Sequence, residues 1–302
     1  MLGNRLVRIQ GGCGRRRLQP AAGAILAVAM VVIASCTHAG NDHPATTTSR
    51  QFTHPGGADE VVIEVSRGGG LVLPVVRVGD TLPRVWISGD GHYLRQVAGA
   101  TDNPALVTLE ERRIPEATLQ NLLTEANNAG LLADSPDFGA PKIFDAVNTR
   151  ILAVTDGKRH DVLVRALGYP VSDLDAATVA ARERVSRFID LLEHPERIAG
   201  AGAPHTYTPA GVAVWVLGPA PASTSAPAAT WPLGDLATVG TPTDWPAPSA
   251  RCLVVAGDDL RAVDASAAGT SRSAPWHSGN GLWQIAMRPL LPDEHTCADV
   301  GK

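Results

Sequence analysis

The stretch that decides the fold is RVWISGDGHYLRQV, residues 84–97. Two runs rich in β-branched and aromatic residues surround Gly89-Asp90-Gly91, and a tight turn between strands needs positive φ angles at its centre. The segment therefore predicts a β-hairpin. A second hairpin is expected where Asp156-Gly157 separates Asn148–Val154 from Arg159–Leu167. Two such hairpins make an antiparallel sheet the expected core of the fold.

Further strands are expected on both sides of these hairpins. Upstream, Glu60–Ser66 (EVVIEVS) and Leu71–Val78 (LVLPVVRV) are separated by Gly68-Gly69-Gly70, which we interpret as a bulge or turn between two strands. Near the end of the chain, three more apolar segments of strand length occur, with a short helix predicted over Asp258–Asp264; these strands are Val212–Leu217, Arg251–Ala256 and Gly281–Arg288.

Two segments carry apolar residues at helical spacing. The first is Pro115–Leu131, whose apolar positions at intervals of three and four are Leu119, Leu122, Leu123 and Ala126. The second runs from about Leu174 to Glu193, with Ser172 or Asp173 as its N-cap. The predicted class is therefore α+β, with an antiparallel sheet and two packed helices over residues 59–197 and a smaller β-rich unit over residues 198–302.

Two cysteines remain once the first 36 residues are set aside, and they are Cys252 and Cys297. An even pair in an exported chain predicts a disulfide, which here closes the C-terminal unit. Metal ligation or redox catalysis by these thiols is the alternative. The sequence gives neither any support, because it has no C-x-x-C motif and no histidine at ligand spacing from Cys252.

The N-terminus has the pattern of a lipoprotein signal peptide. Arginines precede an apolar run, Ala21–Ala34, which at about 14 residues is too short to span a bilayer. The run ends in Ile33-Ala34-Ser35-Cys36, which resembles a lipobox. We expect residues 1–35 to be removed, Cys36 to carry a diacylglyceryl group that holds the protein at the outer face of the cell membrane, and residues 36–58 to form a flexible tether. An ordinary secretory signal or an uncleaved anchor is the alternative.

Charge and motifs exclude several function classes. Residues 1–35 hold five of the 26 basic side chains and none of the 30 acidic ones, so the mature chain has a formal charge of about −9. This sign argues against nucleic acid as a partner. The sequence has no HExxH, GxSxG, P-loop or dinucleotide-binding motif, and its histidines have no shared ligand spacing. We therefore predict no catalytic residues, no metal and no cofactor, and a function in binding an envelope protein or a small ligand.

Tryptophan supplies the one indication of a binding surface. Five of the six tryptophans lie beyond residue 200. Three of them adjoin proline in loop-like sequence and are candidates for lining a groove, namely Trp231, Trp245 and Trp276. The alternative is that these side chains fill the core of the C-terminal unit.

Several runs together resemble a family of exported proteins and lipoproteins of high-GC Gram-positive bacteria. They are Val61–Leu71 (VVIEVSRGGGL), Leu82-Pro83 before Ser88–Gly91, the helix at 115–131, and Arg288–Glu294 with Cys297. This resemblance implies an envelope location and no particular activity.

A shorter resemblance covers Ser66–Gly70, which is similar to the strand and Gly-Gly turn of emfourin-type metallopeptidase inhibitors. It implies a second hypothesis, an exported peptidase inhibitor that uses the Gly68–Gly70 loop, although Leu71 stands where those inhibitors have an aromatic residue. A third hypothesis is an envelope hydrolase whose reactive residues only the fold brings together.

Overall fold

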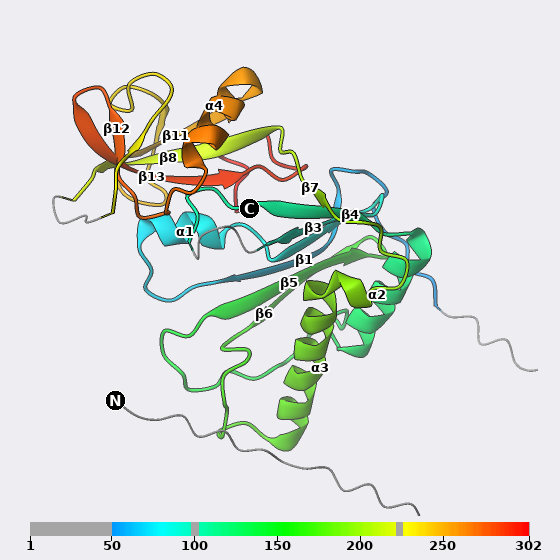
Figure 1. Cartoon of the computed structure of the whole chain (residues 1–302). Helices are drawn as coiled ribbons and strands as arrows, with labels where there is room; N and C mark the ends of the chain where they lie inside the picture. The colour runs from blue at the N-terminus through cyan, green and yellow to red at the C-terminus, as the bar shows by residue number, and fades with distance from the viewer. Residues whose placement is uncertain (1–49, 98–102, 222–225, 302) are drawn as a thin grey trace, which may run out of the picture. The chain divides into compact units, whose positions relative to one another are not determined.

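A computed structural model describes residues 50–97, 103–221 and 226–301. The predicted signal peptide, the lipidation site Cys36 and the first part of the predicted tether lie outside these residues. Ser49–Lys302 make up one compact unit, in which helices pack against two sheets (Figure 1). The class is α+β, as predicted. Within the described ranges, no helix combines the length and the apolar character that crossing a membrane requires.

The first sheet has seven strands in the order β6-β5-β1-β2-β3-β4-β7. Their bounds are β1 (Val61–Gly68), β2 (Val85–Ser88), β3 (His92–Gln96), β4 (Leu109–Arg113), β5 (Asn148–Thr155), β6 (Lys158–Val164) and β7 (His205–Thr206). Both predicted hairpins are present, as β2–β3 and β5–β6. The β5–β6 turn places Asp156 and Gly157 at φ angles of 53° and 70°, which is the conformation that the Asp-Gly pair favours.

Two helices, α2 (Glu116–Asn128) and α3 (Ala176–Glu193), cover one face of this sheet (Figure 1). Leu119, Leu122, Leu123 and Ala126 of α2 are buried in one core cluster with Val185, Phe188, Ile189 and Leu192 of α3. The cap of α3 differs from the prediction, because the side chain of Asp175 accepts the Thr178 N–H. The helix begins after Asp175, and not after Ser172 or Asp173, because the Asp175 side chain is the one that accepts a free N–H of the first turn.

The second sheet has six strands in the order β10-β11-β8-β13-β12-β9. Their bounds are β8 (Gly211–Pro219), β9 (Ala229–Thr230), β10 (Thr241–Thr243), β11 (Ala250–Ala256), β12 (Trp276–Ser278) and β13 (Gly281–Pro289), and α4 (Gly257–Ala267) packs against them. The first six residues of β8 are all buried, because this strand lies inside the sheet with both faces covered. The predicted disulfide is present and joins Cys252 of β11 to Cys297, with 6.2 Å between the Cα atoms.

One predicted strand is wrong. Residues 71–78 do not pair in a sheet, and Pro74–Asp80 instead form the helix α1. Pro74 starts this helix, where a missing N–H costs nothing and the fixed φ suits the first turn. Val75 and Val78, three residues apart, are buried against the second sheet in a cluster with Trp215 and Ala286. Their spacing is therefore that of a helix face, although β-branched residues at these positions suggested a strand.

The folded unit also begins earlier than predicted. Phe52, which lies in the segment assigned to the tether, is buried in the core under α2. Its backbone N–H donates to the side chain of Gln120 over 2.8 Å, and the Gln120 side-chain amide donates back to the Phe52 carbonyl. Phe52 is part of the folded unit, because its side chain is buried in the apolar core and both its backbone N–H and its carbonyl are hydrogen-bonded.

The two sequence regions are interleaved in the structure. β7 comes from the C-terminal region but pairs with β4 in the first sheet. In the other direction, α1 comes from the N-terminal region and packs on β13 of the second sheet. The chain therefore reaches the second sheet at α1, returns to the first sheet at β2, and passes to the second sheet again after β7, through residues 207–210, so the two sheets belong to one unit.

Candidate functional site

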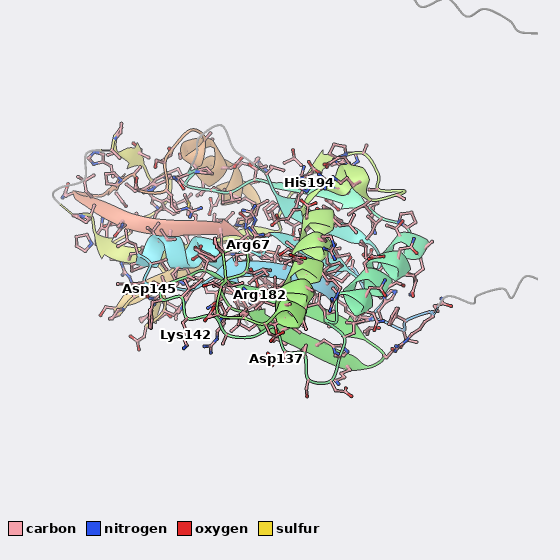
Figure 2. All side chains as sticks on the ribbon, turned by 90° about the horizontal axis from the view of Figure 1, so that it is seen from below. Arg67, Asp137, Lys142, Asp145, Arg182 and His194 are labelled. Atoms are coloured by element: carbon pink, nitrogen blue, oxygen red, sulfur yellow. A yellow bond between two sulfur atoms is a disulfide. The ribbon has the colours of Figure 1, made fainter. Side chains whose placement is uncertain are left out.

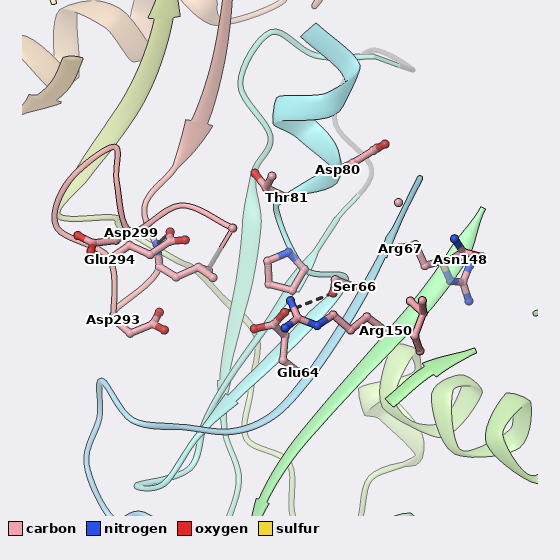
Figure 3. Close-up of a pocket in the computed structure, with 15 residues that line it drawn as sticks. Glu64, Ser66, Arg67, Asp80, Thr81, Asn148, Arg150, Asp293, Glu294 and Asp299 are labelled. Atoms are coloured by element: carbon pink, nitrogen blue, oxygen red, sulfur yellow. Dashed lines mark hydrogen bonds between the residues drawn. The ribbon is translucent and has the colours of Figure 1, made fainter. Parts of the chain in front are cut away.

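A cavity of about 300 Å³ opens between the first sheet, the end of α1 and the C-terminal loop (Figure 3). Strands β1, β5 and β6 form one wall, and the loop after β13 forms the other. The polar and charged side chains on its lining are Glu64, Ser66, Arg67, Asp80, Thr81, Asn148, Arg150, Asp293, Glu294 and Asp299. These come from four separate segments, so only the folded chain assembles the site.

Alternation along β1 explains why carboxylates face this cavity. Successive side chains of a strand point to opposite faces of the sheet. Ile63 and Val65 are fully buried in the core under the helices. Glu64 and Ser66 therefore face the other way and line the cavity. The helix-covered face of the strand is apolar, and the cavity face is polar.

Glu64 is half-buried on the wall of the cavity. Within the described residues, its Oε1 accepts one hydrogen bond, from the Ser66 hydroxyl over 3.3 Å (Figure 3). Burial raises the pKa of the Glu64 carboxyl, and the positive charge of Arg150 opposes this rise without cancelling it. The charge of Arg150 is shared between two carboxyls, because its guanidinium makes two hydrogen bonds to the Asp161 carboxylate, of 2.7 and 2.5 Å.

Two further carboxyls share this condition. Burial raises the pKa of Asp80, against the opposing charge of Arg272. Burial also raises the pKa of Asp293, against its own backbone N–H and the charge of Arg288. Among the residues that the structure describes, none of Glu64, Asp80 and Asp293 forms a salt bridge. Glu64 and Asp80 are half-buried and Asp293 is exposed, so the cavity holds three carboxyls with a raised pKa and no salt bridge, two of which have lost part of their contact with water.

The floor beside the cavity is a buried ion pair between Arg288 of β13 and Glu294. Arg288 has no exposed side-chain surface, and its guanidinium also donates to the Thr81 carbonyl over 3.2 Å. Glu294 accepts the backbone N–H of Leu291 over 2.8 Å. This pair connects the C-terminal loop to the end of α1 and fixes the wall that carries Asp293. Glu294 is therefore committed to the fold, whereas Asp293 is not.

The net charge of the cavity is negative. Its five carboxylates face only two lining cations, Arg67 and Arg150. Both arginines have other partners, since Arg67 lies 3.5 Å from Glu193 and Arg150 is bound to Asp161. The arrangement favours a cation in the cavity. In the parts of the chain that the structure covers, no three His, Cys, Asp or Glu side chains are placed to hold a metal ion.

The structure separates the three tryptophans that the sequence grouped. Trp231 and Trp276 are buried and pack edge to face, with ring centroids 6.0 Å apart, in the core that includes α4. Trp245 belongs to a different cluster and packs edge to face on Trp215 at 5.2 Å. Trp231 and Trp276 therefore fill the core, which was the alternative reading. Of the three, Trp245 alone is half-exposed, and it lines a cavity of about 680 Å³ next to the disulfide.

The Gly68–Gly70 loop lies at one end of the candidate cavity. Gly69 and Gly70 have φ angles of 107° and 77°, which favour glycine. A Cβ atom on Gly70 would stand 3.1 Å from the carbonyl oxygen of Asp145. The loop therefore rests against the segment around Asp145, and the residue after it, Leu71, is almost fully exposed.

Sequence analysis missed the cavity acids. One signal was present, because Glu64 interrupts the β-branched run VVIEVS, and a carboxylate in the middle of a buried strand needs a reason. No local signal connects Glu64 with Asp80 and Asp293, because the three belong to segments that meet only in three dimensions.

Comparison with known proteins assigns no family to this chain, so the function has to be inferred from the geometry of the site. No protein-family model, no curated protein and no solved structure matches this chain.

Proposed function

We propose that the mature protein is a lipoprotein, held at the outer face of the cell membrane by Cys36, whose folded unit binds a small cationic ligand in the cavity at Glu64. The observation that carries the ligand class is the pair of half-buried carboxyls without a salt bridge, Glu64 and Asp80, with the exposed carboxyl of Asp293 on the same cavity. A buried charge without a partner is costly. A ligand ammonium group would supply the missing counter-charge, so part of the binding free energy would come from relieving that cost.

The size of the cavity restricts the ligand further. Ligand cavities commonly span about 300–1,000 Å³, and this one lies at the lower limit. A small amine fits this volume better than a peptide or an oligosaccharide. Ser66 and Asn148 add hydrogen-bonding groups on the same wall. We therefore expect a compact ligand with at least one ammonium group and further polar atoms.

This function is binding, without a metal or cofactor. The envelope location rests on the signal-peptide pattern and on the lipobox resemblance at Cys36. The partners that follow are the membrane, reached through the diacylglyceryl group, and a ligand outside the cell. Two acyl chains make such an anchor durable where one would not.

Binding should depend on pH in a defined direction. A ligand cation stabilises the ionised carboxylates, so it lowers their raised pKa values and its binding releases protons. The affinity should therefore rise as the pH increases through the raised pKa of Glu64, starting from its ordinary value of 4.5. A neutral ligand would show no such rise.

Titration calorimetry with a panel of small amines tests the ligand class. The panel contains 1,4-diaminobutane, glucosamine and arginine amide, and each is measured at two pH values. We expect at least one amine to bind, with an affinity at least about tenfold weaker for Glu64→Gln, which removes a charge without changing size. Asp258→Asn is the matched control, since Asp258 is exposed on α4 and pairs only with Arg261. If Glu64→Gln and Asp258→Asn bind the amine equally well, or if no amine binds to the wild type, the cavity is not an amine-binding site.

Intact mass and membrane fractionation test the anchor. We expect a diacylated mature protein in the membrane fraction, and an unprocessed or soluble product from Cys36→Ala. A soluble wild-type protein without acyl groups would refute the anchor and leave the ligand proposal untouched.

One observation favours hydrolysis as a second candidate. Asp293 lies close enough to Glu64 for its negative charge to raise the pKa of the Glu64 carboxyl further. A carboxylic acid with a raised pKa beside a second carboxylate is the arrangement that general acid catalysis of glycoside cleavage uses. A screen with chromogenic glycosides would detect this activity, and Glu64→Gln should abolish it. Turnover that depends on Glu64 would replace the binding proposal.

A further inference from the structure

Three large apolar side chains stand in water at one end of the first sheet. The exposed fraction is 95% for Leu71, 67% for Leu73 and 91% for Phe144. Their loops touch, because a Cβ on Gly70 would lie 3.1 Å from the Asp145 carbonyl oxygen. Leu71 follows Gly70 and Phe144 precedes Asp145, so the two loops carry these side chains together. We name Leu71, Leu73 and Phe144 the apolar tip.

The apolar tip contributes nothing to the core. The remaining exposed large apolar side chains are less exposed; they are Val147, Leu163, Tyr169, Val254 and Leu282. Val147 and Tyr169 line a common pocket. Contiguous exposed apolar side chains commonly mark a contact with a membrane or another protein. A side chain with more than nine tenths of its surface in water also stands clear of its neighbours, so it forms neither a groove nor a flat face that a folded partner could match.

We propose that the apolar tip inserts into the interfacial layer of the membrane to which the protein is anchored. This inference rests on the proposed anchoring at Cys36. The acyl chains would hold the protein near the bilayer, and the tip would fix which face of the folded unit meets the lipid. A fluid lipid surface suits isolated protruding side chains, because lipid tails adapt to their shape.

The position of the chain entry is compatible with this orientation. Arg50 is bound to Asp156 at the β5–β6 turn, with 2.7 Å between Nη2 and Oδ2. The tip lies at the opposite end of β5, where Asn148 pairs with Gly68. β5 has eight residues, so it spans about 27 Å. The chain from Cys36 to Arg50 can extend to about 45–50 Å, and the anchor and the tip can therefore reach the same surface.

The charge around the apolar tip is mixed. The loops 67–73 and 141–147 carry two cations, Arg67 and Lys142, against one carboxylate, Asp145. Figure 2 labels these three side chains at the same end of the sheet. Arg67 lies 3.5 Å from Glu193, and Asp173 accepts the backbone N–H of Lys142 over 2.9 Å, so this end carries both signs of charge and no excess of positive charge. Arg67 and Asn148 also line the candidate cavity, so insertion of the tip would bring the cavity close to the membrane surface.

Vesicle flotation tests the tip without the anchor. The protein used is residues 37–302, which retains the whole compact unit and lacks Cys36. It is mixed with vesicles of phosphatidylglycerol and phosphatidylethanolamine in equal parts. We expect the partition coefficient to fall at least about tenfold when Leu71→Asp and Phe144→Asp are combined. Each change removes an apolar side chain that the lipid would bury and adds a charge in its place. Leu282→Asp, at an exposed leucine of the second sheet, should leave it unchanged.

Failure of flotation by the wild type, or equal flotation by the double variant, overturns the proposal. Self-association that the double variant abolishes, measured by sedimentation without vesicles, would also overturn it and assign the tip to a second copy of the chain. Acylation of Cys36 does not enter this experiment, so a failed anchor and a failed tip give different results.

Discussion

The two faces of strand β1 have opposite character although they come from the same eight residues. Ile63 and Val65 point toward α2 and α3 and are completely buried in an apolar core. Glu64 and Ser66 point the other way, into a cavity with an excess of negative charge. The helix-covered face therefore contributes to stability, while the cavity face holds charges that the isolated fold would be more stable without. Such a local conflict between sequence and stability is typical of a functional site.

The largest loss of stability is expected at the buried ion pair between Arg288 and Glu294, which lies beside the cavity. Arg288→Met should lower the free energy of unfolding by about 3–5 kcal/mol, because it leaves Glu294 buried without its counter-charge. Urea denaturation at neutral pH measures the effect. Adding Glu294→Gln, which keeps an acceptor for the Leu291 N–H, should recover part of the loss. If the single and double variants are equally unstable, the unpaired charge of Glu294 is not the cause of the loss of stability.

A core substitution on the helix-covered face should come next. Leu123→Ala should cost about 2–5 kcal/mol, since Leu123 is fully buried between α2 and the sheet. Leu163→Ala is the matched change on the cavity face, where 54% of the side chain is exposed. It should cost less than about 1 kcal/mol. Similar losses in denaturation experiments would remove the contrast between the two faces.

Glu64→Gln should have the opposite sign. The unfolded chain ionises at the ordinary pKa of 4.5, and the folded chain ionises at a higher pH. The free energy of unfolding of the wild type therefore falls as the pH rises through this interval and stays lower above it. Glutamine cannot ionise, so the variant should be more stable than the wild type at neutral pH and equal to it below pH 4.5. Thermal melts across this range measure the difference, and a less stable variant at neutral pH would contradict it.

The smallest effect is expected at the apolar tip. Leu71→Asp should change the free energy of unfolding by less than about 0.5 kcal/mol, because the side chain is 95% exposed. The same melts provide the measurement. A large loss of stability would mean that Leu71 packs in the fold, and the membrane contact would then lose its basis.

Local patterns predicted most of the fold. The two Asp-Gly turns, the apolar spacing of α2 and α3, and the pair Cys252–Cys297 each depend on a few neighbouring residues or on a simple count, and the structure confirms them. The errors occurred where tertiary contacts decide. Pro74–Asp80 is a helix because Val75 and Val78 find a partner in the second sheet. Phe52 is ordered because α2 covers it.

The candidate site lay beyond such patterns. Glu64 and Asp80 lie on consecutive elements, but most of the chain separates them from Asp293, and the three carry no motif. Their shared cavity and their lack of salt bridges are properties of the assembled fold. Trp231 and Trp276 gave the wrong indication because proline beside tryptophan is typical of a loop, whereas these two rings turn inward and pack on each other. Trp245 does line a cavity.

The pKa of the Glu64 carboxyl, followed by carbon-detected NMR through a pH titration, tests the central claim most directly. We expect a pKa above the ordinary 4.5 in the free protein, and a lower pKa when a cationic ligand occupies the cavity. A pKa at or below 4.5 in the free protein would contradict it, because Glu64 would then already have the counter-charge that the ligand is proposed to supply.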